Sequence, residues 1–317
     1  MPSVDVSLDE LHLYVPETQP PPHLAEFWDD TLAAAGQTAL DVNLTPAGPG
    51  LAGVTHHQLS FSGLGGARIT GWYARPDGHG PFPGVVWYHG YGGRGGRPLE
   101  LYTLAAQGVA VLSMDCRGQT GDSPDTPLQA GHGAGWLTRG LADPTTHYYR
   151  YVYADAVRAV EALASFDEVD SGRMAVTGAS QGGGLALAAA ALSRRIRFVW
   201  ADVPFLCDFP RGVATATEGP YLEVAELLRR RPDWEAQTFR TLAHFDATNL
   251  APRVSCPAIV TVALWDPICP PSTIFGMFRR LANADKELVV LPYQGHDVPY
   301  EVDERRLTTL VSRLSRP

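Results

Sequence analysis

The chain has 317 residues, enough to bury a large core in one or two domains. Its formal net charge of −9 argues against nucleic acids and anionic membranes as partners, because both bind basic surfaces. The N-terminal residues lack a basic-then-apolar signal segment, and the longest apolar run, 185–192, is too short to cross a bilayer. We therefore expect a cytoplasmic protein.

The first elements in chain order are predicted to precede the main fold. Residues 1–54 are expected to form an N-terminal extension with a helix over 24–35. Two β-rich segments, 57–61 and 68–73, then flank a glycine turn, which predicts an antiparallel hairpin.

From residue 84 onward, apolar strands alternate with helical segments. Strands are predicted at 84–88, 109–113, 173–177, 198–203, 258–262 and 287–291. Helices are predicted at 98–107, 148–165, 181–193, 272–282 and 304–314. This alternation predicts the α/β class, with a mostly parallel twisted sheet and helices on both faces. Active sites of such sheets lie at the carboxyl ends of the strands.

Residues 205–252 interrupt the alternation with two further helical segments, 220–230 and 233–245. We interpret them as a helical insertion within one domain that spans 1–317. The insertion either forms a roof over the active site or packs to one side of it.

The segment Gly178-Ala179-Ser180-Gln181-Gly182 lies between a predicted strand and a predicted helix. This Gly-x-Ser-x-Gly pattern is typical of the nucleophile elbow of α/β-hydrolases, in which a strained turn exposes a serine hydroxyl. A Cβ atom at either outer glycine is expected to collide with neighbouring backbone. We predict that Ser180 is the nucleophile.

A serine nucleophile needs a base and an acid, which follow it along the chain in this fold. Asp266 comes directly after a predicted strand and is our candidate acid, with Asp202 as the alternative. His296 follows the last predicted strand and is the only histidine beyond Asp266, so it is our candidate base.

The loop His89-Gly90-Tyr91-Gly92-Gly93 follows the strand at 84–88. Such a glycine-rich loop provides one backbone N–H of the oxyanion hole, and the residue after the nucleophile provides the other. We assign these donors to Tyr91, with Gly90 as the alternative, and to Gln181. His89 is expected to support the loop without transferring protons.

The four cysteines are Cys116, Cys207, Cys256 and Cys269. They form no Cys-x-x-Cys pair and show no metal-ligand spacing with a histidine, so we expect buried free thiols and no zinc site. The chain also lacks nucleotide-binding and zinc-peptidase motifs, so we expect neither a cofactor nor a resident metal.

Taken together, three motifs resemble carbohydrate esterase family seven, the acetyl xylan esterases and cephalosporin C deacetylases. They are Arg117-Gly118-Gln119, the segment around Ser180, and His296 with the acid that follows it, here Asp297 where the family usually has glutamate. Shorter matching segments cover nearly the whole chain. Trp265 stands where we expect a smaller aliphatic residue, and it either narrows the pocket or packs in the core.

The resemblance implies deacetylation of small acetylated compounds by Ser180, His296 and Asp266, with Tyr91 and Gln181 as the oxyanion hole. It also implies that Arg117 and Gln119 support the site. Acetylated xylooligosaccharides and cephalosporin C are the implied substrates, and a homo-hexamer is the implied assembly. Two alternatives stay open: hydrolysis of another acyl compound (a thioester, a lactone or a small peptide), or a catalytically silent scaffold.

Overall fold

The computed structural model describes residues 4–48, 50–96, 98–124 and 134–315. The strands are β1 (Asn43–Pro46), β2 (Val54–Ser62), β3 (Arg68–Pro76), β4 (Phe82–Tyr88), β5 (Ala110–Met114), β6 (Val169–Ala179), β7 (Ile196–Asp202), β8 (Ala258–Ala263) and β9 (Lys286–Leu291). The helices are α1 (Leu8–Leu13), α2 (Leu24–Gly36), α3 (Pro98–Ala105), α4 (Tyr148–Ala164), α5 (Gln181–Leu192), α6 (Phe209–Thr215), α7 (Tyr221–Arg230), α8 (Glu235–Leu242), α9 (Ala247–Leu250), α10 (Pro271–Arg280) and α11 (Tyr300–Leu314). None of these helices is both long enough and apolar enough to cross a bilayer.

The described strands form a nine-stranded sheet in the order β1-β2-β3-β5-β4-β6-β7-β8-β9. The pairs from β5 to β9 are parallel, whereas β1, β2, β3 and β5 pair antiparallel. Parallel neighbours need a long crossover, and the helices between the strands provide it. The predicted hairpin and the predicted mostly parallel sheet are both confirmed.

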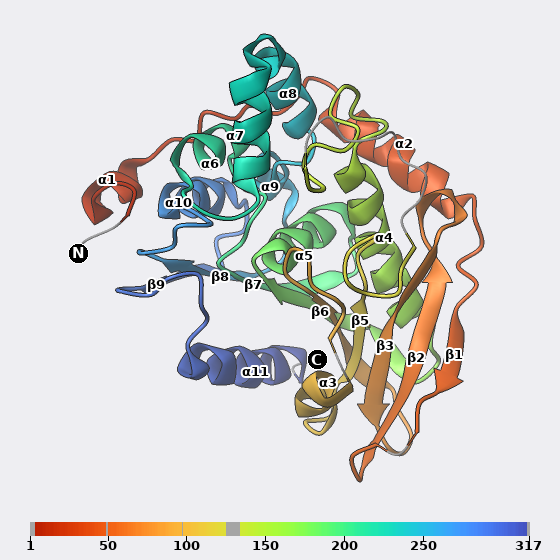
Figure 1. Cartoon of the computed structure of the whole chain (residues 1–317). Helices are drawn as coiled ribbons and strands as arrows, with labels where there is room; N and C mark the ends of the chain where they lie inside the picture. The colour runs from red at the N-terminus through yellow and green to blue at the C-terminus, as the bar shows by residue number, and fades with distance from the viewer. Residues whose placement is uncertain (1–3, 49, 97, 125–133, 316–317) are drawn as a thin grey trace.

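Helices cover both faces of the sheet (Figure 1). α4, α5 and α10 pack in the core cluster on one face, and α3 and α11 pack in the second cluster on the other. α5 is apolar around its whole circumference and is buried from Gln181 to Ala191. An apolar helix of this kind is stable only in a core. α5 therefore holds its own N-terminus, and Ser180 before it, in a fixed position on the sheet.

Several elements differ from the prediction. α1, β1, α6 and α9 were not predicted, because elements of four to seven residues are too short to show a clear period. β6 begins at Val169, four residues before the predicted start at 173. α11 begins at Tyr300, directly after Pro299, and thus four residues before the predicted start at 304. Proline just before a helix and acidic residues in its first turn are start signals that the apolar pattern alone does not include.

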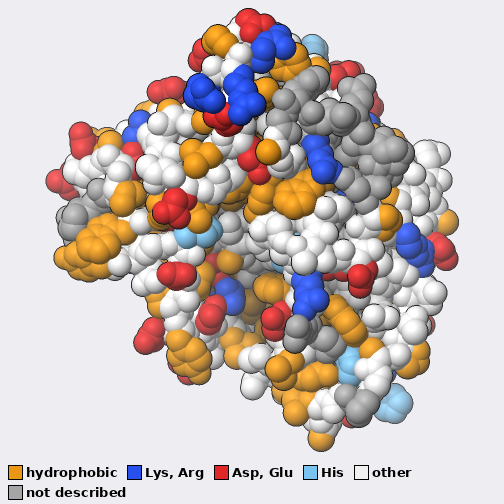
Figure 2. Space-filling model, viewed as in Figure 1, with side chains coloured by type: hydrophobic (Ala, Val, Ile, Leu, Met, Phe, Trp, Pro, Cys, Tyr) orange, Lys and Arg blue, Asp and Glu red, His pale blue; other side chains and the backbone are white. Residues whose placement is uncertain are grey.

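The segment between β7 and β8 is helical, as predicted, and contains α6 to α9. Basic side chains gather at the top of the molecule over α7 and α8 (Figure 2). Arg229 and Arg230 both pair with Glu226, and Arg231 pairs with Asp233, so two carboxylates offset most of the charge of these three arginines.

Candidate active site

Ser180 lies on the turn between β6 and α5 with φ 57° and ψ −121°. A side chain with positive φ is strained, and such a conformation persists only where surrounding contacts fix it. Here the Ser180 N–H donates to the Asp202 carbonyl at 2.9 Å. The Ser180 carbonyl accepts from the N–H groups of Gly184 and Phe205, at 3.1 and 2.9 Å. These three bonds hold the turn between β7 and α5.

The two outer glycines of the elbow have the predicted steric role. A Cβ atom on Gly178 would lie 2.5 Å from the Tyr88 carbonyl oxygen, and one on Gly182 would lie 2.0 Å from the same oxygen. Neither glycine has positive φ, since the left-handed residue is Ser180 itself. The glycines are therefore required by the close approach of β4, not by their own backbone angles.

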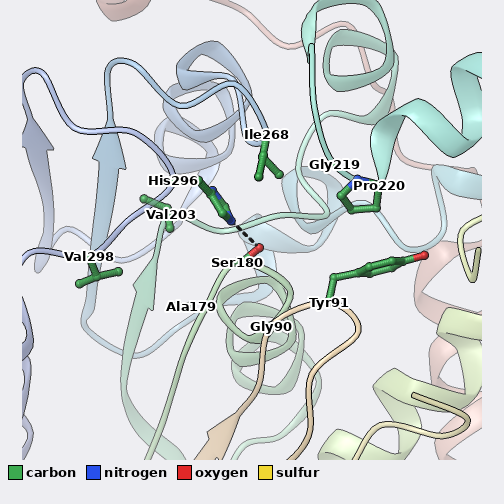
Figure 3. A pocket seen from close by; sticks show the side chains of 10 residues that line it. All are labelled: Gly90, Tyr91, Ala179, Ser180, Val203, Gly219, Pro220, Ile268, His296 and Val298. Atoms are coloured by element: carbon green, nitrogen blue, oxygen red, sulfur yellow. Dashed lines mark hydrogen bonds between the residues drawn. The ribbon is translucent and has the colours of Figure 1, made fainter. Parts of the chain in front are cut away.

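His296 connects Ser180 to Asp266. Its Nε2 lies 2.8 Å from Ser180 Oγ (Figure 3). Its Nδ1 lies 2.7 Å from Asp266 Oδ2. Asp266 is fully buried, and its Oδ1 accepts the N–H groups of Ile268 and Cys269, both at 2.8 Å. The structure thus brings together the loops after β6, β8 and β9. The carboxylate is fixed by backbone donors, which leave its second oxygen to orient the imidazole.

Asp202, the alternative acid, faces another part of the molecule. Its Oδ1 accepts from Trp200 Nε1 at 2.8 Å and Thr261 Oγ1 at 3.1 Å. Its Oδ2 forms an ion pair with Arg306 of α11. Burial raises the pKa of Asp202 and Arg306 opposes that shift. Because His296 bonds Asp266 and Asp202 bonds α11, the geometry favours Asp266.

The loop after β4 lies against the nucleophile. A Cβ atom on Gly90 would be 4.0 Å from Ser180 Cβ. In the described part of the chain, the backbone N–H groups of Tyr91 and Gln181 have no hydrogen-bond acceptor. Figure 3 shows the Tyr91 hydroxyl pointing away from Ser180, so only the backbone of Tyr91 can serve as a donor there. Unpaired N–H groups beside a nucleophile are what an oxyanion hole requires.

Gln119 joins the two segments that carry these donors. Its Oε1 accepts the N–H of Gly92 at 2.9 Å, and its Nε2 donates to Gln181 Oε1 at 2.9 Å. Gln181 Oε1 also accepts from the Tyr149 hydroxyl at 2.9 Å. The side chains of Gln119 and Gln181 are both buried, so this network is shielded from water.

Arg117 is fully buried and pairs with Asp155 of α4 through Nε and Nη2. Nη2 also donates to the Leu64 carbonyl at 2.6 Å. The Arg117 carbonyl accepts from the Tyr148 hydroxyl at 2.7 Å. Burial disfavours the charged guanidinium, but Asp155 outweighs that effect and the pKa of Arg117 is raised. These contacts anchor the loop of Gln119 to α4.

His89 supports the oxyanion loop, as predicted. Its Nε2 accepts the N–H of Cys116 at 2.9 Å, which leaves Nδ1 to donate to the Gly90 carbonyl at 2.7 Å. Burial lowers the pKa of His89, consistent with a neutral ring. His89 therefore fixes the Gly90 carbonyl and does not contact the relay, by which we mean the hydrogen-bonded chain of Ser180, His296 and Asp266.

The sequence analysis missed Glu223, which lies in α7 of the insertion. The Tyr91 hydroxyl donates to Glu223 Oε1 at 2.6 Å and accepts the N–H of Trp136 at 2.8 Å. Glu223 Oε2 accepts the N–H of Leu137 at 3.1 Å. A glutamate in the first turn of a helix is expected there for the helix dipole alone, so its sequence position gave no signal of this contact.

Both expectations for Trp265 were wrong. Its side chain is 44% exposed and does not line the pocket. It packs edge-to-face on Tyr293, with ring centroids 5.2 Å apart. Because the side chain of Asp266 is buried, that of its neighbour Trp265 turns outward to solvent.

The nucleophile opens into a pocket of about 460 Å³ (Figure 3). The insertion provides part of its wall, and none of its lining residues is Asp, Glu, Lys or Arg. The lining residues are Gly90, Tyr91, Ala179, Ser180, Val203, Gly219, Pro220, Ile268, His296 and Val298.

With this geometry established, the chain can be compared with known proteins. Residues 1–314 match the acetyl xylan esterase family (AXE1). The chain belongs to the acetyl xylan esterase family. This confirms the predicted resemblance and the predicted class of carboxylic ester hydrolases.

Two solved structures are similar to this chain over nearly their full lengths. An acetyl xylan esterase from Paenibacillus sp. R4 is 37% identical, with a TM-score of 0.93 over 97% of this chain and 99% of that one. Acetyl xylan esterase 1 from Thermoanaerobacterium sp. JW/SL YS485 is 30% identical, with a TM-score of 0.93 over 98% and 100%. Both confirm the α/β-hydrolase fold.

A curated relative, acetyl esterase Axe7A of Xylanibacter ruminicola, is 30% identical over 234 residues. The match covers 72% of this chain and 52% of that protein, so the chain spans about half the length of this curated relative.

Proposed function

We propose that the chain is a serine acetyl esterase that removes acetyl groups from small sugars through an acyl-enzyme intermediate. The observation that supports this proposal is the hydrogen-bonded chain of Ser180, His296 and Asp266. His296 Nε2 lies 2.8 Å from Ser180 Oγ, and its Nδ1 lies 2.7 Å from Oδ2 of the buried Asp266. His296 takes the proton of Ser180, whose oxygen attacks the ester carbonyl. Asp266 holds the imidazole in the tautomer that can accept this proton.

The backbone N–H groups of Tyr91 and Gln181 are our proposed donors to the negatively charged oxygen of the tetrahedral intermediate. The sugar alcohol leaves with the proton held by His296. Water, deprotonated by the same imidazole, then releases acetate from Ser180. We assign Arg117 and Gln119 to positioning, since their contacts fix the two oxyanion segments and they do not line the pocket.

The residues that line the pocket favour a neutral substrate. Its walls are mainly aliphatic, and none of its lining residues is acidic or a lysine or arginine, so an ionic acyl group has no counter-charge there. Gly219 and Pro220 come from the insertion, which supports the insertion as part of a roof over residues 180 and 296 within one domain.

A substrate panel tests the proposal. We expect hydrolysis of 4-nitrophenyl acetate to exceed that of the butyrate and octanoate esters, and acetylated xylooligosaccharides to release acetate faster than polymeric acetyl xylan. A fluorophosphonate probe is expected to label the wild type and not Ser180→Ala. Faster cleavage of a thioester, lactone or peptide would reassign the substrate class, and an unlabelled wild type would support a silent scaffold.

Cephalosporin C as a substrate and the homo-hexamer stay predictions from the family resemblance, and the cytoplasmic location stays a prediction from the sequence. Sedimentation velocity of the purified chain tests the assembly, and adding cephalosporin C to the substrate panel tests that ester.

A further inference from the structure

Cys269 lies beside the relay in a position that the sequence analysis did not anticipate. Its N–H donates to Asp266 Oδ1 at 2.8 Å, and its thiol is fully buried. One ligand-capable atom from each of Asp266, Cys269 and His296 lies within 4.8 Å of the other two. The fold therefore gathers a sulfur, a nitrogen and an oxygen donor around the base of the proposed reaction.

This donor set selects a particular class of cation. Thiolate and imidazole are preferred by Zn²⁺ and Cd²⁺, whereas Mg²⁺ and Ca²⁺ prefer oxygen ligands alone. We propose that Cys269, His296 and Asp266 form an inhibitory site for thiophilic divalent cations of the Zn²⁺ class. The inhibition rests on the proposed function, because it requires that His296 be the catalytic base.

The distances suit such a cation after a small movement. Zn²⁺ binds sulfur at about 2.3 Å and nitrogen or oxygen at about 2.0–2.2 Å, which places tetrahedral ligands roughly 3.5 Å apart. Pairs that lie up to 4.8 Å apart must therefore approach by about 1 Å, whereas the hydrogen-bonded pair of His296 Nδ1 and Asp266 Oδ2, now 2.7 Å apart, must open to admit the cation. The imidazole can move, since the side chain of His296 is 20% exposed and lines the pocket. The same pocket gives the cation its path from solvent.

The binding step balances in bonds and protons. A metal–sulfur bond forms as the S–H bond of Cys269 breaks, and the thiol proton is released to solvent. The cation also occupies a ring nitrogen of His296, which can then no longer exchange a proton with Ser180. Binding of the cation therefore blocks the proposed base.

Esterase rates and cobalt spectra test the proposal on the full chain. We expect Zn²⁺ and Cd²⁺, but not Mg²⁺, to inhibit hydrolysis of 4-nitrophenyl acetate, with recovery after EDTA. Cys269→Ser should raise the inhibition constant at least about tenfold, since losing even an outer-shell partner costs 10- to 100-fold in affinity. Cys256→Ser is the matched control. Cys256 is also buried, but it lies before the start of β8, whereas Asp266 and Cys269 follow the end of that strand.

A direct readout does not depend on catalysis. Co²⁺ added to the wild type should produce a thiolate-to-cobalt charge-transfer band that is absent in Cys269→Ser and Cys269→Ala and present in Cys256→Ser. Equal inhibition constants in the wild type and Cys269→Ser, or no band in the wild type, would overturn the site. If no ester is hydrolysed but the band forms, the site stands and the proposed function fails.

Discussion

The two sides of Ser180 are built differently. On one side, Asp266 and His296 come from short loops after β8 and β9 and meet the serine through two hydrogen bonds. On the other, the loop of Tyr91 is held by buried side chains from the loop after β5 and from α4 and by the half-buried Glu223 of the insertion. Ser180, His296 and Asp266 meet through a few direct contacts at strand ends, whereas the proposed oxyanion donors are held by a distributed network.

The two sides of Ser180 should therefore respond differently to mutation. A change in the relay removes a group that handles the proton, so it should reduce kcat and leave the fold intact. A change in the network moves backbone donors indirectly, so it should affect stability, or kcat by smaller factors. The following variants test that separation.

Asp266→Asn gives the largest expected effect. The amide favours the wrong tautomer of His296, so kcat with 4-nitrophenyl acetate should fall by about four orders of magnitude while the circular dichroism spectrum is unchanged. Asp202→Asn is the matched control, since it alters a buried carboxylate that bonds Arg306 and not His296. An equal loss in the control would contradict the assignment of the acid.

Arg117→Met should act mainly on stability. It leaves Asp155 buried without its cation, and breaking a buried pair costs about 3–5 kcal/mol. Urea unfolding measures the change in the free energy of unfolding. The double variant Arg117→Met/Asp155→Leu removes both charges and should recover most of the loss. If the double variant is as unstable as the single one, the ion pair is not the cause.

Gln119→Leu should lower kcat without a comparable change in unfolding temperature. It removes the hydrogen bonds that Gln119 accepts from Gly92 N–H and donates to Gln181 Oε1, and a displacement of catalytic groups by about 1 Å costs up to about 100-fold in rate. KM for a small acetyl ester should change little. Gln107→Leu, at an exposed glutamine, is the control. A rise in KM alone would show that Gln119 binds substrate and does not position the donors.

Tyr91→Phe should have the smallest effect, a decrease in kcat of about 2- to 10-fold, because the backbone N–H stays and only the hydroxyl's bonds to Glu223 and to the N–H of Trp136 are lost. Glu223→Ala should cause a similar decrease. If the two residues act through their shared bond, the double variant will be little worse than either single one. Fully additive losses would show that the insertion does not act on the oxyanion loop through this contact.

The relay could be predicted from the sequence because each of its parts is local. Gly178 and Gly182 indicate a tight turn, and Asp266 and His296 directly follow apolar strands. Parallel strands place their carboxyl ends at one edge of a sheet, so the chain order alone brought these loops together. The same periodicity predicted the sheet and its covering helices, but missed the short elements α1, β1, α6 and α9, which have too few residues to show a period.

Only the tertiary structure decided the partners of buried polar groups. Arg117 bonds Asp155, 38 residues away, and Tyr91 bonds Glu223, 132 residues away. Cys269 joins Asp266 and His296, although its sequence spacing predicted no metal site. A buried charge or hydroxyl must find a partner wherever the packed chain provides one, and that choice depends on three-dimensional proximity. No local sequence pattern predicts which partner a buried polar group will have.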